Sequence, residues 1–341
     1  MGKDETWEEL SAYSNSPTQS GQRPSLGLIK TTEFNRLPAT PYLFQLVDGT
    51  DIKLDPEIIA ERETAIADFR EEIRKRLAIT PRQEVFLFVH GVGNQFDDAV
   101  ETAAQLWHFL GREGVPIAYT WPAGSEGLFF YAYDRESSDF TIFHLKQFAK
   151  ILASIPEIER IHVISHSRGT DVSLTALREL VIEARAAGTN PHDLFKIENV
   201  VLIAPDLDFE ITMQRNVSEG LGAAFGQMTI YTSTDDGAMN AAKTLFSSRV
   251  RLGSTQPEDL TEQQRATLRR QHNLDFVIYQ GQFGGSFGHS YAVDNPAVGS
   301  DIVALLRYGK APGKENGRPL EHLGENFWLL TDNYMEAGAS Q

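Results

Sequence analysis

Ser167 is the residue whose type and setting most directly indicate chemistry. An apolar run rich in β-branched residues begins at Arg160 and ends abruptly in Ser-His-Ser-Arg-Gly at residues 165–169. A helical repeat of apolar residues follows from Asp171, so the stretch predicts a buried strand, a sharp turn and a helix. A serine at such a turn has its hydroxyl raised above the sheet edge, where it can act as a nucleophile. Because Ser-x-Ser-x-Gly also occurs by chance in serine-rich loops, the prediction depends on a base, an acid and an oxyanion hole elsewhere.

A nucleophilic serine needs a general base, and the base needs a carboxylate that orients it. His289 is the predicted base, because it lies in a glycine-rich loop after the last predicted strand. Asp236 is the predicted acid, since it stands beside a glycine at the crest of the turn after the strand at 228–233. Asp235 and Asp206 also follow strands and remain alternatives for the acid. The alternative for the histidine is an ordinary polar loop residue.

The negative charge that develops on a carbonyl oxygen needs two preorganised donors. The backbone amide of Arg168, directly after the candidate nucleophile, is one predicted donor. The second is the amide of Val92, which follows Gly91 in the loop after the apolar run at 85–89. His90 is expected to orient this loop through its ring. The alternative for this segment is a plain strand-to-helix turn.

The elements that must position these residues alternate along the chain. Continuous apolar runs predict buried strands, and periodic stretches between them predict helices. This alternation is typical of a mostly parallel sheet with helices on both faces, whose active sites lie at the carboxyl ends of the strands. The predicted strands are 85–89, 117–121, 160–166, 199–204, 228–233 and 275–279, and the predicted helices are 98–110, 140–152, 171–187, 238–246 and 298–306.

The chain divides into four parts by composition. We expect a flexible polar arm over residues 1–30, then strands and an amphipathic helix at 31–80 that pack on the core. The domain that carries the strands, helices and candidate site residues is expected over 81–310, followed by a C-terminal tail at 311–341. The segments available to cover a pocket are the long connection at 123–138, the insert at 251–272 and the N-terminal segment.

Composition excludes several classes of function. The 341 residues include 31 Lys and Arg against 47 Asp and Glu, a net charge of −16, which disfavours nucleic acid and anionic membranes as partners. The chain has no cysteine, so disulfides and thiolate metal sites are excluded. No transmembrane stretch or signal peptide is found, which favours the cytoplasm, although a removed signal is compatible with the sequence. Oligomeric state stays open.

No cofactor or metal is expected. The spacing of Asp206, Asp208 and Glu210 is a weak calcium pattern, because a full loop of oxygen ligands is missing. Metalloprotease and phosphate-loop motifs are also missing from the sequence.

With these residues identified, the chain resembles the α/β-hydrolase superfamily, and within it the bacterial branch known as domain of unknown function 900. The resemblance spans residues 85–306 and implies an α/β-hydrolase fold with an N-terminal extension, and esterase or lipase activity. Its matching pieces are Phe-Val-His-Gly at 88–91, Thr-Trp-Pro at 120–122, Tyr-Asp-Arg-Glu-Ser at 133–137, Ser-His-Ser-Arg-Gly at 165–169, Ala-Pro-Asp-Leu-Asp at 204–208, Tyr-Thr-Ser-Thr-Asp-Asp at 231–236 and Gly-His-Ser-Tyr at 288–291.

Two residues at the turn depart from the Ala-His-Ser-Met-Gly that is frequent in this branch. Ser165 and Arg168 replace the alanine and the methionine. Neither change removes the nucleophile, but Arg168 places a cation beside the site. We expect this cation either to favour an acidic substrate or to pair with Asp134 or Glu136.

The stretch Tyr-Asp-Arg-Glu-Ser at 133–137 has two interpretations. In one it caps the next helix, with Ser137 or Ser138 at the N-cap. In the other it braces the site through an ion pair of Arg135. We favour a structural role, because ion-pair networks near sites are often structural.

These observations together predict a serine hydrolase that cleaves a small carboxylic ester through an acyl-enzyme on Ser167. An amidase or thioesterase would use the same residues. A different class of function is a non-catalytic binding or scaffold protein, in which the helix at 56–78 docks a partner.

Overall fold

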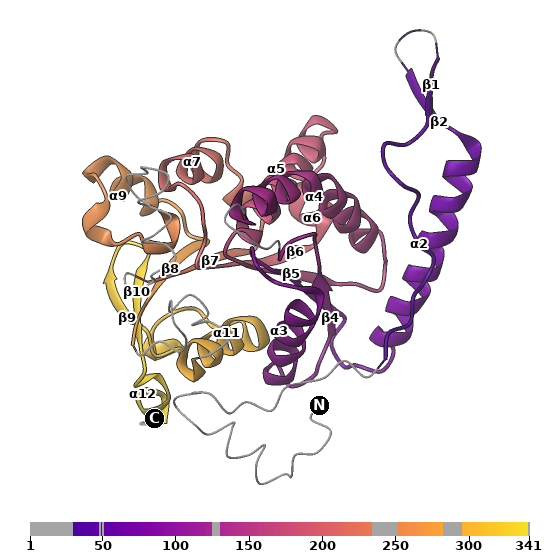
Figure 1. Ribbon diagram of the computed structural model, residues 1–341. Coiled ribbons are helices and arrows are strands. Elements are labelled where there is room, and N and C mark those ends of the chain that lie inside the picture. The colour runs from indigo at the N-terminus through magenta and orange to yellow at the C-terminus, as the bar shows by residue number, and fades with distance from the viewer. Residues whose placement is uncertain are drawn as a thin grey trace.

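The protein is built around one eight-stranded sheet. Figure 1 shows its computed structural model, which describes residues 30–47, 49, 51–124, 130–233, 251–281 and 295–339. The strand order is β4-β3-β5-β6-β7-β8-β10-β9, and every neighbouring pair is parallel except β9 with β10. The strands are β3 (Glu84–Val89), β4 (Val115–Tyr119), β5 (Arg160–His166), β6 (Ile197–Ile203), β7 (Gln227–Thr232), β8 (Leu274–Gln280), β9 (Glu321–Gly324) and β10 (Phe327–Thr331).

The six strands predicted from apolar runs are therefore confirmed, and together with β10 they form the parallel part of this sheet. Three expected features fall outside the described residues: the polar arm, apart from Lys30, the helix at 238–246 and most of the glycine-rich loop after β8.

Helices cover both faces of the sheet, as Figure 1 shows. The helices α4 (Phe130–Ala153), α5 (Gly169–Ala186) and α6 (Pro191–Phe195) lie on one face, and α3 (Phe96–Phe109) and α11 (Pro296–Tyr308) lie on the other. Besides α2, which is described below, the other helical segments of the described residues are α7 (Phe209–Met213), a π turn (Gln214–Ser218), α9 (Glu262–Leu268), α12 (Tyr334–Ala339) and 3₁₀ turns at Gly222–Ala224, Leu252–Ser254, Pro257–Asp259 and Lys314–Asn316.

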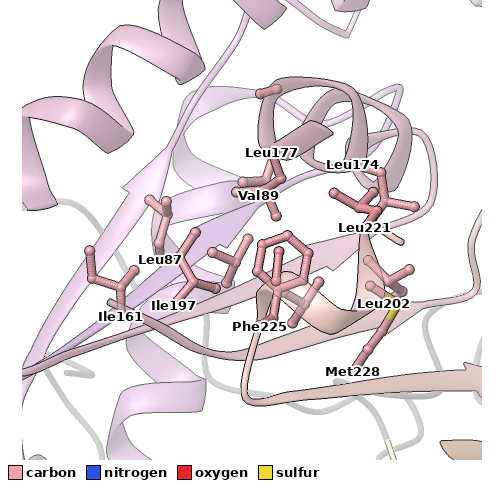
Figure 2. Close-up of a cluster of buried hydrophobic side chains, with 14 of the residues drawn as sticks. Leu87, Val89, Ile161, Leu174, Leu177, Ile197, Leu202, Leu221, Phe225 and Met228 are labelled. Carbon is pink, nitrogen blue, oxygen red and sulfur yellow. The ribbon is translucent and has the colours of Figure 1, made fainter. Parts of the chain in front are cut away.

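The core is split by the sheet into two layers, because successive side chains of a strand point to opposite faces. In β3, Val85, Leu87 and Val89 join one buried cluster, whereas Phe86 and Phe88 join the other. Burying one such side chain contributes about 1.5–3 kcal/mol relative to its exposure. Figure 2 shows part of the first layer, with labelled side chains from β3, β5, α5, β6, β7 and the segment between β6 and β7.

The N-terminal helix α2 (Pro56–Leu77) begins and packs as its sequence predicts. The Asp55 side chain caps it by accepting from the Glu57 amide at 2.9 Å, and proline occupies the first helical position. Phe69 packs on Phe148 of α4 with ring centroids 5.4 Å apart. The helix therefore docks one face on the α4 layer.

A two-stranded hairpin precedes this helix. It consists of β1 (Phe44–Val47) and β2 (Asp51–Leu54), with Phe44 opposite Leu54. In Figure 1 it stands at the upper end of α2, away from the large sheet.

The connection expected at 123–138 is shorter than the sequence indicated, because α4 already begins at Phe130. In the first turns of α4, the side chains that face the protein interior are polar: Asp134, Ser138 and Thr141 are buried. After Thr141, the first buried apolar side chain on this face of the helix is Leu145. A search for apolar periodicity misses such a start. The same geometry shows that Ser137 and Ser138 lie inside the helix, so the prediction of either as its N-cap is wrong.

The segment after residue 310, expected as a tail, completes the sheet. β10 pairs in parallel with β8, and its Phe327 stacks on Phe276 with centroids 4.5 Å apart. The apolar group at 327–330 therefore belongs to the main core. β9 then pairs antiparallel with β10 and forms the outer edge.

A fully buried ion pair ties this segment to the rest of the protein. The Arg318 guanidinium donates to both carboxylate oxygens of Asp301 on α11, at 2.7 and 2.8 Å. The hydroxyl of Tyr231 on β7 donates to the same carboxylate at 2.7 Å. Burial raises the pKa of Tyr231 well above its ordinary value, so the phenol stays a donor.

A second charged cluster lies at the amino end of β3. Glu84 is buried and contacts Arg82, Arg160 and His162. Burial alone would raise the pKa of Glu84, but the hydrogen bonds from His162 and Arg82 outweigh it and hold the pKa at about 2, below the ordinary value of 4.5.

Because the pKa of Glu84 is depressed in the folded state, its ionised form stabilises the fold above pH 4.5, and this contribution is lost as the pH falls toward 2. We expect Glu84→Gln to lower the free energy of unfolding by about 2–3 kcal/mol at pH 7, and by much less at pH 3. Urea unfolding of both proteins at the two pH values measures this. An equal difference at both would contradict the assignment.

No helix in the described part of the chain is long and apolar enough to cross a bilayer.

Candidate active site

Ser167 occupies the turn between β5 and α5, at the carboxyl edge of the sheet. Its backbone has a φ of +52°, an uncommon value for a residue with a side chain. The Ser167 amide donates to the carbonyl of Ile203 at 2.9 Å, which ties the turn to β6. Strained backbone of this kind persists only where the surroundings hold it, and it concentrates at functional sites.

Two glycines allow the turn to sit against the loop after β3. A Cβ atom on Gly169 would lie 2.6 Å from the carbonyl oxygen of Val89 and closer still to that of His90. A Cβ atom on Gly91 would lie 2.7 Å from the Ser167 Cβ and 3.3 Å from its Oγ. Both positions must therefore be glycine for the loop to contact the serine.

Ser165 takes the small-residue position two residues before Ser167. It is fully buried, and its Oγ donates to the Oγ of Ser173 on α5 at 2.6 Å. The hydroxyl thus finds a partner within the strand–helix unit, which explains how serine replaces alanine here.

The two residues whose amides are predicted as oxyanion donors are each next in the chain to a residue of the serine turn or of the loop that contacts it. Arg168 follows it directly and is the N-cap of α5, where backbone amides and the helix dipole favour negative charge. Val92 follows Gly91, which is in contact with the Ser167 side chain. Within the described residues, neither amide donates a hydrogen bond.

His90 is buried, and both of its ring nitrogens contact backbone groups of the loops after β3 and β4. Its Nε2 accepts from the Trp121 amide at 3.0 Å, so its Nδ1 is the donor to the Gly91 carbonyl at 2.9 Å. The Trp121 indole donates back to the His90 carbonyl at 2.8 Å, and the two rings stack. Burial lowers the pKa of His90, which keeps the ring neutral.

The Arg168 side chain forms an ion pair with a carboxylate of its own helix, and not with Asp134 or Glu136 as the sequence predicted. Its Nη2 lies 2.8 Å from Asp171 and 3.9 Å from Asp139, and its Nε donates to Ser138 at 3.2 Å. The Arg168 side chain is 9% exposed. The predicted pairing with Asp134 or Glu136 is therefore wrong, since an i, i+3 partner lies closer.

Asp134 contacts backbone instead. It is fully buried, and its Oδ2 accepts from the amides of Gly93 at 2.9 Å and Gly124 at 3.1 Å. These glycines belong to the loops after β3 and β4.

Asp206 follows β6 and is 2% exposed. One carboxylate oxygen accepts from the Tyr131 hydroxyl and the other from the Arg251 guanidinium. Burial, followed by the charge of Asp206, raises the pKa of Tyr131. Neither partner was predicted from the sequence, because Tyr131 and Arg251 are far from Asp206 in the chain and contact it only in the folded protein.

The weak calcium pattern shows no metal-site geometry. Asp206 is engaged as above, and Asp208 caps α7 by accepting from the Ile211 amide at 3.0 Å. Among the described residues, no cluster of three or more His, Cys, Asp or Glu side chains could hold a metal ion.

The predicted acid and base, Asp236 and His289, and the alternative acid Asp235, lie outside the described residues. The strands that precede them are described. β7 and β8 are neighbours in the sheet, run parallel to β5 and end at the same edge as Ser167.

The parallel sheet, the helices on both faces and the serine turn after the interior strand β5 define an α/β-hydrolase fold. Residues 65–307 match the family model described as alpha/beta hydrolase of unknown function (DUF900), and the chain belongs to this family.

No curated protein sequence matches the chain. Solved structures similar to it include an esterase of Pyrococcus furiosus (15% identity, TM-score 0.38, covering 67% of this chain and 82% of that one). Another is an esterase of Pyrobaculum calidifontis (12%, TM-score 0.33, 75% and 99%). Esterases of Rhizomucor miehei are also similar (14%, TM-score 0.32, 66% and 74%). The family match and the strand order remain the basis for the fold.

Proposed function

We propose that the protein is a serine hydrolase that cleaves small carboxylic esters. The observation that carries the proposal is the backbone of Ser167, held at positive φ directly after β5 and in contact with Gly91. A serine presented in this way, with two amides beside it, has the parts of an acyl-transfer site.

In the proposed reaction the Ser167 Oγ attacks the ester carbonyl carbon while the His289 imidazole takes its proton. The carbonyl oxygen becomes an oxyanion and accepts hydrogen bonds from the Val92 and Arg168 amides. Collapse breaks the bond to the alkoxy group, which leaves as the alcohol with the proton from His289. A water molecule then hydrolyses the acyl-enzyme by the same steps.

Asp236 is kept as the acid that orients His289. The surroundings of Asp206 support this choice, because both of its carboxylate oxygens already accept from Tyr131 and Arg251. Through these two hydrogen bonds, Asp206 links Tyr131 on α4 to Arg251 in the segment after β7.

Fluorophosphonate labelling followed by peptide mapping tests the proposal. We expect an adduct on Ser167 in the wild type, and labelling slowed by about 10³-fold or more in His289→Ala. Asp236→Asn is expected to lose most of the rate, whereas Asp206→Asn should keep more of it at equal folded fraction. Melting curves provide the correction for folding.

A folded wild-type protein without an adduct would instead favour the scaffold alternative. If Asp236→Asn is labelled faster than Asp206→Asn, then Asp206 and not Asp236 is the acid that orients His289. Turnover of matched ester, thioester and amide substrates then separates the esterase from the other two activities.

A further inference from the structure

The loops after β3 and β4 are joined at one buried carboxylate. Asp134 is fully buried on α4, and a single oxygen accepts from Gly93 at 2.9 Å and from Gly124 at 3.1 Å. Both glycines have positive φ, +72° and +84°, which turns their amides toward the carboxylate. Hydrogen bonds to an ionised acceptor are about twice as strong as neutral ones.

A second connection joins the same two loops closer to the strands. Trp121 donates its backbone amide to the His90 ring and its indole N–H to the His90 carbonyl. The rings stack with centroids 5.1 Å apart. Gly124 also lies against Asn94, since a Cβ at 124 would be 3.3 Å from the Asn94 carbonyl oxygen. The two loops therefore form one unit with two attachment points.

Val92 lies between these attachment points. On its N-terminal side, Gly91 contacts Ser167 and its carbonyl accepts from the His90 ring. On its C-terminal side, the Gly93 amide is held by Asp134. The peptide plane that carries the Val92 amide is thus constrained from both directions.

We propose that Asp134 is a positioning residue for the oxyanion hole. It fixes the loop after β3 so that the Val92 amide points at the developing oxyanion. This role rests on the proposed function, because it assigns a purpose to the amide in that reaction. Donors of this kind are effective only when they are preorganised, and a misplacement of about 1 Å can cost about 10²-fold in rate.

Kinetics of Asp134→Ala and Asp134→Asn test the proposal. With a p-nitrophenyl ester we expect Asp134→Ala to lower kcat by about 10–100-fold, with KM changed by no more than about twofold. A trifluoromethyl ketone, which forms a tetrahedral oxyanion adduct on the serine, should bind more weakly by a similar factor. Asn keeps an acceptor oxygen in place, so Asp134→Asn should recover most of both losses.

Glu136→Ala is the matched control, because Glu136 is an exposed carboxylate on the same helix. It should leave kcat, KM and inhibitor affinity unchanged. If Asp134→Ala does not fold, Asp134→Ser, whose short side chain cannot reach both loops, provides the same comparison. Unchanged inhibitor affinity in a folded Asp134→Ala or Asp134→Ser protein would overturn the proposal.

Hydrogen exchange separates this proposal from the proposed function. The backbone amides of 91–94 should exchange faster in Asp134→Ala than in wild type, whether or not the protein hydrolyses esters. If fluorophosphonate does not label the wild-type protein, the proposed hydrolase function is wrong. The Val92 amide then has no oxyanion to bind, whatever the exchange rates are. Unchanged exchange in a labelled, active protein would remove the role of Asp134 alone.

Discussion

Replacing Ser167 with alanine is expected to lower kcat/KM for a short-chain ester by about 10³–10⁶-fold. The hydroxyl is the atom that forms the acyl-enzyme in the proposed reaction, and the neighbouring amides alone retain only residual catalysis. The backbone contacts of the turn, such as the bond from the Ser167 amide to Ile203, do not involve the side chain. The melting temperature should therefore stay close to that of the wild type. Steady-state hydrolysis and thermal unfolding of both proteins measure the two effects.

Ser165→Ala is the control for this experiment. Ser165 is buried two residues away, and the variant loses one hydrogen bond to Ser173. We expect activity within a few-fold of wild type and a stability change of about 1 kcal/mol. A Ser167→Ala protein that keeps a tenth of the wild-type rate would show that the serine is not the nucleophile.

The largest expected loss of stability belongs to Arg318→Ala. Removing the guanidinium leaves the Asp301 carboxylate buried with its charge uncompensated, since Arg318 is its bidentate partner. Breaking one half of a buried pair typically costs about 3–5 kcal/mol. The loss should appear as a lower midpoint in urea unfolding at neutral pH, with the slope unchanged.

Arg178→Ala is the matched comparison at the surface. Arg178 pairs with Glu219, and both side chains are partly exposed to solvent. Exposed pairs contribute about 0–1 kcal/mol, so this variant should unfold close to the wild-type midpoint. Similar midpoints for Arg178→Ala and Arg318→Ala would mean that the buried pair does not hold the C-terminal segment.

Much of the architecture follows from the sequence because its strands are continuous apolar runs. The run at 85–89 became β3, and the turn after β5 was located by Ser167 and Gly169. The start of α4 was missed because its buried stripe is polar at Asp134 and Ser138. Apolar periodicity detects an inward face only when that face is made of apolar residues.

Contacts that follow from two neighbouring parallel strands could be predicted, whereas contacts that depend on how loops and side chains pack could not. Contact between Gly91 and Ser167 follows from two neighbouring parallel strands that each end in a tight turn. Tyr131 and Arg251, in contrast, reach Asp206 across 75 and 45 residues of chain. Arg168 pairs with Asp171 because residues three apart on a helix are neighbours, and this partner depends on the helix beginning at Gly169.

The pairing of β10 with β8 also bears on the solubility of the protein. An edge strand exposes unpaired N–H and C=O groups to which another chain can add, and native proteins favour short edge strands for that reason. β8 has seven residues, mostly buried, whereas the outer strand β9 has four that are largely exposed. The C-terminal segment therefore replaces a long apolar edge with a short polar one. A protein truncated before Phe327 would expose β8 as a template for intermolecular sheet growth.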